Sequence, residues 1–153
     1  MAGQTELSFM SSDSRTTVYA TLWEPEGEPV GVVQICHGMA EHIGRYAWLA
    51  GQLCAKGYVV CGDDHLGHGR TALTKDDLGY FGERDGWDHL IEDEHGMRKE
   101  LEKRSRACRF SCSGTAWAPS SREVTWPGMG PACRAISAGG RRALFLGRGW
   151  GFS

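Results

Sequence analysis

The sequence lacks the long hydrophobic runs and the leader pattern that mark membrane and secreted proteins. No stretch approaches the roughly 18 apolar residues that a membrane-spanning helix needs, and residues 1–10 have no basic region followed by an apolar one. The six cysteines form no Cys-x-x-Cys pair, which argues against a disulfide scaffold. With 153 residues we expect no transmembrane segment and at most one domain, cytoplasmic and with reduced thiols.

Acidic residues are nearly absent from the last third of the chain. Up to Arg104 there are 10 basic and 18 acidic residues, whereas residues 105–153 have seven Arg, no Lys and one acid, Glu123. The same segment has no His, Asp, Asn, Gln or Tyr. Such a switch indicates either a basic tail on an acidic domain or a change of reading frame. We therefore divide the chain into a partial domain, 1–104, and a tail, 105–153, that we expect to be disordered.

The first 104 residues have an alternation of strand and helix patterns. Residues 30–36 and 58–61 are short apolar runs typical of strands buried on both faces, and residues 5–9 and 17–23 have looser strand patterns. The first helical apolar stripe is formed by Tyr46, Leu49, Ala50, Leu53 and Cys54. The second follows Asp85 and is formed by Trp87, Leu90, Ile91, Met97 and Leu101. This alternation predicts an α/β fold with right-handed crossovers and a largely parallel sheet.

A polar loop follows each of the two buried strand patterns. In a parallel sheet, the loops that leave the carboxyl ends of the strands hold the chemistry. The first loop, residues 37–46, opens with a His-Gly step, where the backbone can turn sharply and leave an N–H free, as an oxyanion hole requires. The second, residues 63–70, has glycines that permit a tight turn. We expect the two loops to lie beside each other.

Metal binding and plain loop structure are the competing interpretations of these polar residues. His37, His42, His65, His68 and Asp64 could converge on a metal ion, but their spacing fits no usual zinc pattern. Alternatively, the side chains hydrogen-bond the loop backbone, which is the simplest account of His42, His65 and His68 taken singly. That account leaves unexplained why both loops follow adjacent strands. We predict no metal site in these loops.

The residues of both loops resemble those of a known family. Residues 37–46 read His-Gly-x-x-Glu-His-x-x-Arg-Tyr, and residues 64–69, after one helix and one strand, read Asp-His-x-Gly-His-Gly. The pair is similar to the N-terminal part of the monoglyceride lipase and lysophospholipase branch of the α/β-hydrolases, also grouped as serine aminopeptidase-like. The resemblance covers roughly residues 7–104. It implies the N-terminal portion of an α/β-hydrolase fold, with a mostly parallel sheet and flanking helices.

The resemblance also implies roles for particular residues. It makes the backbone N–H of Met39 one donor of the oxyanion hole. The residues that it implies shape the pocket are His37, Gly38, Glu41, His42, Asp64, His65, Gly67, His68 and Gly69. It implies a small lipid-like carboxylic ester as substrate, such as a monoacylglycerol or a lysophospholipid, and neither a metal nor an organic cofactor. Head group, acyl chain, esterase or peptidase preference and oligomeric state stay open.

The catalytic triad of that family is missing from this chain. The family places a Gly-His-Ser-Met-Gly elbow after the next strand, and an Asp and a His further on. The nucleophile is expected near Ala116, but no Ser there lies in a Gly-x-Ser-x-Gly frame. Ser137 has a partial elbow around it, yet a turn-rich run precedes it and no Asp or His follows. With no catalytic residue intact, we expect negligible turnover.

A shift of reading frame accounts for the missing elbow. When the last base of each codon is grouped with the first two of the next, residues 113–118 permit Gly-His-Ser-Met-Gly. The final Gly is compulsory, because Trp117 has the single codon TGG. The same regrouping of residues 107–122 permits a buried strand, the elbow and the start of a helix. We infer a one-nucleotide deletion near residues 104 and 105, or an equivalent error in the gene sequence.

Two further expectations concern the tail. Taken at face value, it is a basic arm that binds nucleic acid through Arg141, Arg142, Arg148, Trp150 and Phe152. Its spacing shows no organised face, and out-of-frame translation of a GC-rich gene yields the same composition, so we expect no nucleic-acid binding. A disrupted strand in this region also leaves residues 30–36 as an exposed apolar sheet edge, which predicts marginal folding.

Overall fold

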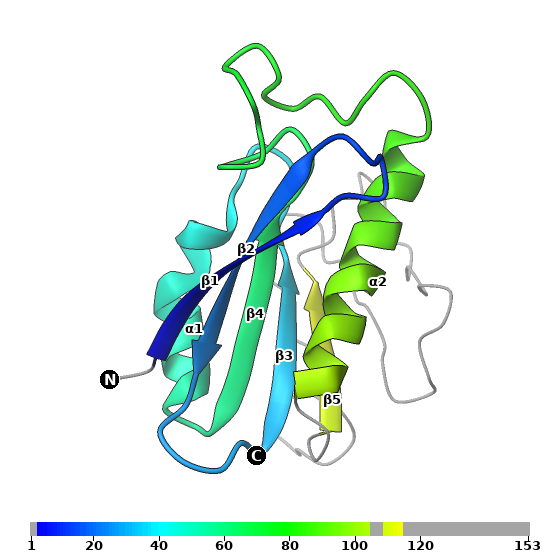
Figure 1. Cartoon of the computed structure of the whole chain (residues 1–153). Coiled ribbons are helices and arrows are strands. Elements are labelled where there is room, and N and C mark those ends of the chain that lie inside the picture. The colour runs from blue at the N-terminus through cyan, green and yellow to red at the C-terminus, as the bar shows by residue number, and fades with distance from the viewer. Residues whose placement is uncertain (1–2, 105–108, 115–153) are drawn as a thin grey trace, which may run out of the picture.

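The strands and helices follow one another in the expected alternation. In the computed structural model the described residues are 3–104 and 109–114. The strands are β1 (Gly3–Met10), β2 (Thr17–Glu24), β3 (Gly31–Cys36), β4 (Tyr58–Asp64) and β5 (Arg109–Gly114). The helical segments are the 3-10 helix η1 (Ile43–Tyr46), α1 (Ala47–Cys54) and α2 (Gly86–Arg104). Figure 1 shows these elements along the chain.

The strands form one mixed sheet in the order β1-β2-β4-β3-β5. β3 runs parallel to β4 and to β5, whereas β2 is antiparallel to both β4 and β1. The α/β class is therefore confirmed, and the antiparallel part comes from the N-terminal hairpin, whose direction the strand patterns did not specify. A hairpin needs only a short turn, while the parallel neighbours are connected through helices.

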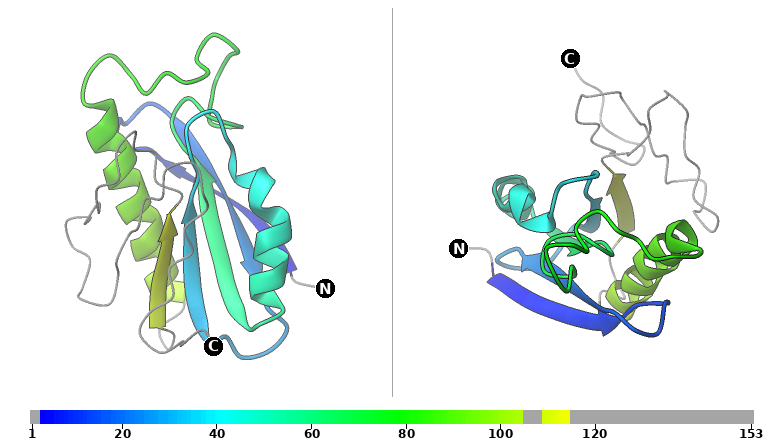
Figure 2. Two further views of the ribbon diagram at one scale, coloured as in Figure 1. Left: turned by 180° about the vertical axis from the view of Figure 1, so that it is seen from behind. Right: turned by 90° about the horizontal axis from the view of Figure 1, so that it is seen from above.

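The two helices cover opposite faces of the sheet, as the two views in Figure 2 show. Successive side chains of a strand point to opposite faces, so Val33 packs in one core with α1 and Val32 in another with α2. On the α2 side, Met97 is 3% exposed and Leu101 is 1% exposed. Trp87, in the first turn of α2, is 45% exposed and departs from the expected stripe. The two cores fix each helix against its face of the sheet. They therefore also position the loops that leave the ends of the strands.

Glycine allows a close approach between η1 and the sheet. A Cβ atom on Gly62 of β4 would lie 2.6 Å from the carbonyl oxygen of Ile35 and would also overlap the side chain of Ile43. Ile43 is 2% exposed at this contact. The absence of a side chain at Gly62 therefore sets the position of η1, and with it the position of the loop between β3 and η1.

The expectation that residues 30–36 form an exposed sheet edge is wrong. β5 pairs with β3 along its whole length, from Gly31 opposite Arg109 to Cys36 opposite Gly114. Parallel pairing uses backbone N–H and C=O groups, so it accepts a sequence whose side chains favour no strand. The α2 crossover brings the chain back to this edge. β3 is therefore an internal strand between β4 and β5.

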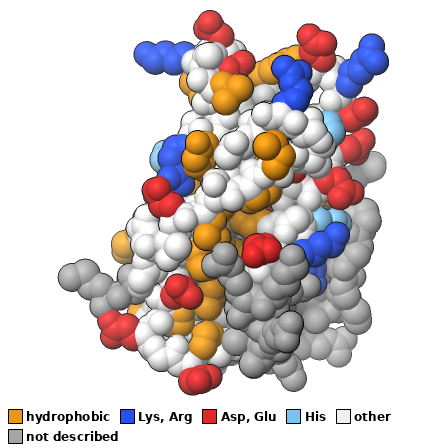
Figure 3. Space-filling view, in the orientation of Figure 1, with side chains coloured by type: hydrophobic (Ala, Val, Ile, Leu, Met, Phe, Trp, Pro, Cys, Tyr) orange, Lys and Arg blue, Asp and Glu red, His pale blue; other side chains and the backbone are white. Residues whose placement is uncertain are grey.

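The outer surface carries both charges and some exposed apolar side chains. In the connection between β4 and α2, Leu73 is 76% exposed and Leu78 is 60% exposed. Apolar side chains are visible among charged ones on the upper part of the face in Figure 3. No helix within the described part of the chain is long and apolar enough to cross a membrane.

Candidate active site

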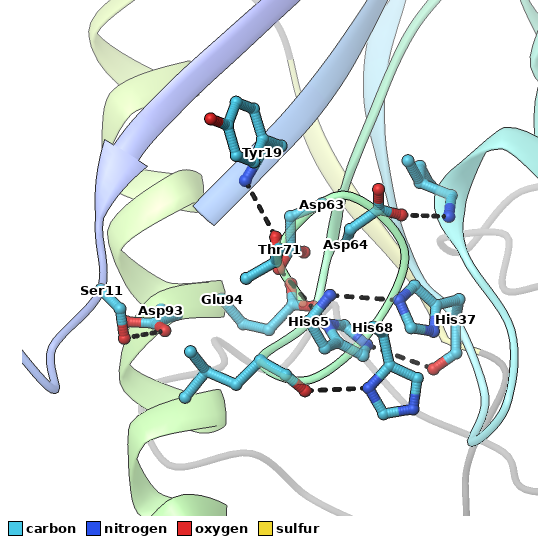
Figure 4. Close-up of polar contacts among 12 residues, drawn as sticks. Ser11, Tyr19, His37, Asp63, Asp64, His65, His68, Thr71, Asp93 and Glu94 are labelled. Carbon is cyan, nitrogen blue, oxygen red and sulfur yellow. Dashed lines mark hydrogen bonds and ion pairs between the residues drawn. The ribbon is translucent and has the colours of Figure 1, made fainter. Parts of the chain in front are cut away.

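Two loops meet at one edge of the sheet, at the carboxyl ends of β3 and β4. The first loop begins at His37, directly after β3, and the second begins at His65, directly after β4. Because β3 and β4 are parallel neighbours, the loops leave the sheet side by side. Figure 4 shows His37, His65 and His68 gathered where they meet.

His37 connects the two loops as a neutral imidazole. Its Nε2 accepts a hydrogen bond from the backbone N–H of His65 at 3.1 Å, and its Nδ1 lies 2.8 Å from the carbonyl oxygen of Gly38. These partners require a proton on Nδ1 and none on Nε2. The two imidazole rings stack with centroids 3.9 Å apart. Burial, reinforced by the neighbouring His65, lowers the pKa of His37 from 6.5 to about 4.

His68 makes a second connection between the loops. Its Nε2 accepts from the backbone N–H of Ala40 at 3.3 Å, and its Nδ1 lies 2.9 Å from the carbonyl oxygen of Leu66. Ala40 has a φ of 59°, an uncommon left-handed conformation for a residue with a Cβ. His68 thus holds the turn at residues 39–40 against the second loop.

Glu41 holds the start of the first loop. Its carboxylate accepts from the backbone N–H of Gly38 at 3.2 Å and from the hydroxyl of Tyr46 at 2.5 Å. Arg45 lies 3.5 Å away on the outer side. The Tyr46 hydrogen bond is the main reason that the pKa of Glu41 lies below its ordinary value. Glu41 is therefore an ionised acceptor that closes the turn around Met39.

Asp64 stabilises both loops from the end of β4. Its two carboxylate oxygens accept from the backbone N–H groups of Ile43 at 2.8 Å and of Arg70 at 2.9 Å. Gly69, with a φ of 48°, approaches so closely that a Cβ would lie 2.6 Å from an Asp64 oxygen. The tight turn expected at the second loop depends on this contact and on glycine at position 69.

The backbone N–H of Met39 lies at the tip of this hydrogen-bonded turn. Among residues 3–104 and 109–114 it has no hydrogen-bond partner, and the Met39 side chain is 47% exposed. His42, also expected to shape the pocket, has an exposed side chain, and its carbonyl oxygen accepts from the N–H of Arg45. Of the expected residues, His42 therefore contributes least to the contacts between the loops.

A second buried cluster lies between the end of β4 and α2. Asp63, His65 and Glu94 are 1%, 5% and 3% exposed. His65 Nδ1 lies 3.2 Å from Asp63 Oδ2 and 3.4 Å from Glu94 Oε1, while its Nε2 lies 3.2 Å from the carbonyl oxygen of His37. The amide of Gln34 donates to the Glu94 carboxylate and, at 3.0 Å, to its backbone carbonyl. Through the contacts of His65, this cluster stabilises the start of the second loop.

Charge is distributed unequally in this cluster. Burial, and then the charge of Asp63, raise the pKa of Glu94 well above its ordinary value. Burial opposes the ionisation of Asp63 and of His65, but their mutual attraction outweighs it, so the pKa of Asp63 is lowered and that of His65 is raised. Asp63 and His65 accordingly form an ion pair, whereas burial and the Asp63 charge disfavour the ionisation of Glu94.

Asp63 and Glu94 are not among the predicted site residues, although each leaves a signal in the sequence. Asp63 follows directly on a strand pattern buried on both faces, and β4 runs beyond the expected residue 61 to Asp64. Glu94 falls on the apolar stripe of α2 between Leu90 and Met97, where a carboxylate is out of place. A charged residue on a buried stripe indicates a partner inside the fold.

The remaining expected positions lie outside the described residues. These are the nucleophile position near Ala116, the alternative Ser137, and the basic tail residues from Arg141 onward. The described site therefore consists of the two loops and the Asp63 cluster.

Comparisons with known proteins agree with this arrangement. Residues 27–116 match the model of a hydrolase family described as serine aminopeptidase, S33. The chain is 43% identical over 68 residues to a monoacylglycerol lipase of Mycolicibacterium smegmatis, an alignment that covers 44% of this chain and 24% of that protein. It is 38% identical over 76 residues to a monoglyceride lipase homolog of monkeypox virus, covering 48% of this chain and 28% of that protein.

A solved structure superposes on most of this chain. The thermostable carboxyl esterase of Bacillus coagulans, determined in complex with glycerol, superposes with a TM-score of 0.66 at 34% sequence identity. The match covers 73% of this chain and 36% of the esterase. The chain thus spans about a quarter to a third of the length of these three proteins.

Proposed function

The chain belongs to the serine aminopeptidase S33 family of hydrolases, and from that premise we propose that it is the N-terminal part of a serine esterase for monoacylglycerol-like substrates. The observation that supports this most is the Met39 N–H, which has no partner among the described residues and lies on a turn held by Glu41 and His68. A free N–H at the carboxyl end of a parallel strand is suited to stabilise an oxyanion.

In the complete enzyme, the proposed reaction is acyl transfer to a serine. The serine hydroxyl gives its proton to a histidine base and attacks the ester carbonyl carbon, whose oxygen becomes the oxyanion. The Met39 N–H and the N–H of the residue after the serine donate to that oxygen. The glycerol oxygen then leaves with the proton from the histidine, and water hydrolyses the acyl-enzyme.

The register of β5 supports the frame-shift hypothesis for the missing serine. β5 ends at Gly114, opposite Cys36, which directly precedes the loop that contains Met39. The regrouped codons of Thr115 and Ala116 permit Ser, so the serine of a restored frame would follow β5 at once. It would enter the fold at the same edge as Met39, where the proposed reaction needs it.

For the chain as it stands, we propose negligible esterase activity. It has no serine in an elbow frame near Ala116, and His, Asp and Lys are absent from residues 105–153. Without the nucleophile and its base, an oxyanion donor alone retains only a small part of the rate enhancement.

Two expressed proteins test the proposal: the chain as it stands, and the product of the same coding DNA with one nucleotide restored near codon 105. Both are assayed on a monoacylglycerol and on a chromogenic short-chain ester. We expect hydrolysis by the restored protein alone, and its loss when the elbow serine is replaced by alanine. A folded restored protein without ester hydrolysis, or activity of the present chain that Ser137→Ala abolishes, would contradict the proposal.

A further inference from the structure

The three buried side chains Asp63, His65 and Glu94 face one another between the end of β4 and α2. One ligand atom from each lies within 4.8 Å of the other two. Asp63 Oδ1 and Glu94 Oε1 are buried without a hydrogen-bond partner among the described residues, although Glu94 Oε1 lies 3.4 Å from His65 Nδ1. Unpartnered carboxylate oxygens in a dry interior are costly, and such atoms commonly bind a cation.

The orientation of His65 matches that of a metal ligand. Its Nε2 lies 3.2 Å from the carbonyl oxygen of His37, so this nitrogen carries the proton and donates it there. Once a metal ion displaces the other ring proton, the lone pair is on Nδ1, which lies 3.2 Å from Asp63 Oδ2 and 3.4 Å from Glu94 Oε1. Histidine ligands in proteins usually donate their second ring N–H to a carbonyl or carboxylate in this way.

A residue outside the cluster, Gln34, also fixes the orientation of the Glu94 carboxylate. The Gln34 amide donates to Glu94 Oε2, which leaves Glu94 Oε1 directed at the cluster. Asp63 offers Oδ2 at 3.2 Å from His65 Nδ1 and keeps Oδ1 available. Among the described residues no Lys or Arg pairs with either carboxylate. Two carboxylates and one imidazole are a ligand set that suits divalent transition metals such as Zn²⁺.

We propose that Asp63, His65 and Glu94 form a buried binding site for one divalent transition-metal ion. The ion takes one or both oxygens of Asp63, Nδ1 of His65 and Oε1 of Glu94, and it replaces the protons that occupy the cluster otherwise. This site shares His65 with the His-rich set considered in the sequence, but its two carboxylates, Asp63 and Glu94, were not part of that set. By linking β4 to α2, the metal stabilises the second loop and not the reaction itself.

Zinc alone is the probe. The full chain, freed of metal by a chelator, is titrated with Zn²⁺ in a calorimeter, and its thermal midpoint is followed by circular dichroism. We expect one ion per chain and a raised midpoint, because the ion binds the folded state. Glu94→Gln and Asp63→Asn should each weaken binding about tenfold or more, since even outer-shell partners contribute about 10–100-fold. Glu92→Gln, an exposed carboxylate on the same helix, should bind as the parent does.

A spectroscopic readout keeps the test decisive if the cluster variants do not fold. Co²⁺ added to the parent chain should show d–d bands of nitrogen and oxygen ligands, without thiolate charge-transfer bands from the buried Cys36, Cys54 or Cys61. Thiolate bands, the absence of Zn²⁺ binding, or unchanged binding in both Glu94→Gln and Asp63→Asn would overturn the proposal. In those cases the cluster is a carboxyl pair that shares a proton.

Discussion

Acidification should destabilise the chain through His37. The ring accepts a hydrogen bond at Nε2 from the N–H of His65, so a proton added to Nε2 would place two N–H donors opposite each other. The same proton would bring positive charge into a buried site beside a second histidine. Protonation of His37 at Nε2 and its hydrogen bond from the His65 N–H are therefore mutually exclusive.

The size and sign of the effect follow from the pKa values. His37 has a pKa of about 4 in the folded chain and 6.5 as its ordinary value, which we take for the unfolded chain. Between these values the unfolded state binds more protons, so the free energy of unfolding falls as the pH is lowered. One pKa unit corresponds to about 1.4 kcal/mol, which gives a loss of up to about 3 kcal/mol between about pH 6.5 and about pH 4. Below that range the loss is complete.

Urea unfolding at a series of pH values measures this loss. His37→Asn can still donate to the Gly38 carbonyl but does not titrate, so its stability should depend less on pH by the amount given above. His42→Asn, at an exposed histidine of the same loop, should keep the pH dependence of the parent. Titratable groups that do not contact His37 are common to all three proteins. Equal pH dependence of the parent and His37→Asn would refute the reasoning.

Three further predictions rest on single contacts. Gly62→Ala should destabilise the chain by about 1–3 kcal/mol in urea unfolding, because the added Cβ would meet the Ile35 carbonyl oxygen. Gly96→Ala should instead stabilise the chain by about 0.5–1 kcal/mol, because Gly96 lies inside α2 and has open space around it. Asp93→Ala should cost about 1–3 kcal/mol by thermal unfolding, because Asp93 accepts from the Ser11 hydroxyl and the Ser12 N–H, both at 2.6 Å. In the frame-restored enzyme, Met39→Pro removes the backbone N–H and should lower kcat about 10²–10³-fold with little change in KM. Met39→Ala keeps the N–H and should leave kcat unchanged. Equal kcat values for Met39→Pro and Met39→Ala would show that the Met39 N–H is not an oxyanion donor.

Periodicity was sufficient to predict the parts of the fold that bury apolar side chains. The runs at residues 30–36 and 58–61 and the helical stripe ending at Cys54 are read from side-chain spacing, and burial in the two cores requires that spacing. Gly57, with a φ of 86°, ends the first helix as its lack of a Cβ allows. Local pattern and tertiary packing agree in this part of the chain.

Two kinds of interaction could not be predicted from the sequence. They are the hydrogen bonds of the backbone and the contacts between residues that lie far apart along the chain. β5 pairs through its main chain, so its side chains carried no strand signal that periodicity could detect. Glu94 meets Asp63 and His65 only because the α2 crossover returns across β4, a contact between residues about 30 positions apart that no local pattern encodes. The two loops could be predicted because their residues match a known motif. Asp63 and Glu94 are not part of that motif.

The turn that holds Met39 is stabilised by hydrogen bonds among residues that precede α2. Its four described supports are the hydrogen bonds of Glu41 to Gly38, of His68 to Ala40, of Asp64 to Ile43 and of His37 to His65. All of these residues lie between β3 and the second loop, before α2 begins. The proposed loss of the serine therefore leaves these four hydrogen bonds in place, because the serine is expected after β5 and the hydrogen bonds lie before α2. Under the proposed frame shift, a restored frame would supply the nucleophile, its base and the remaining sheet, whereas the turn around Met39 is formed by residues already present.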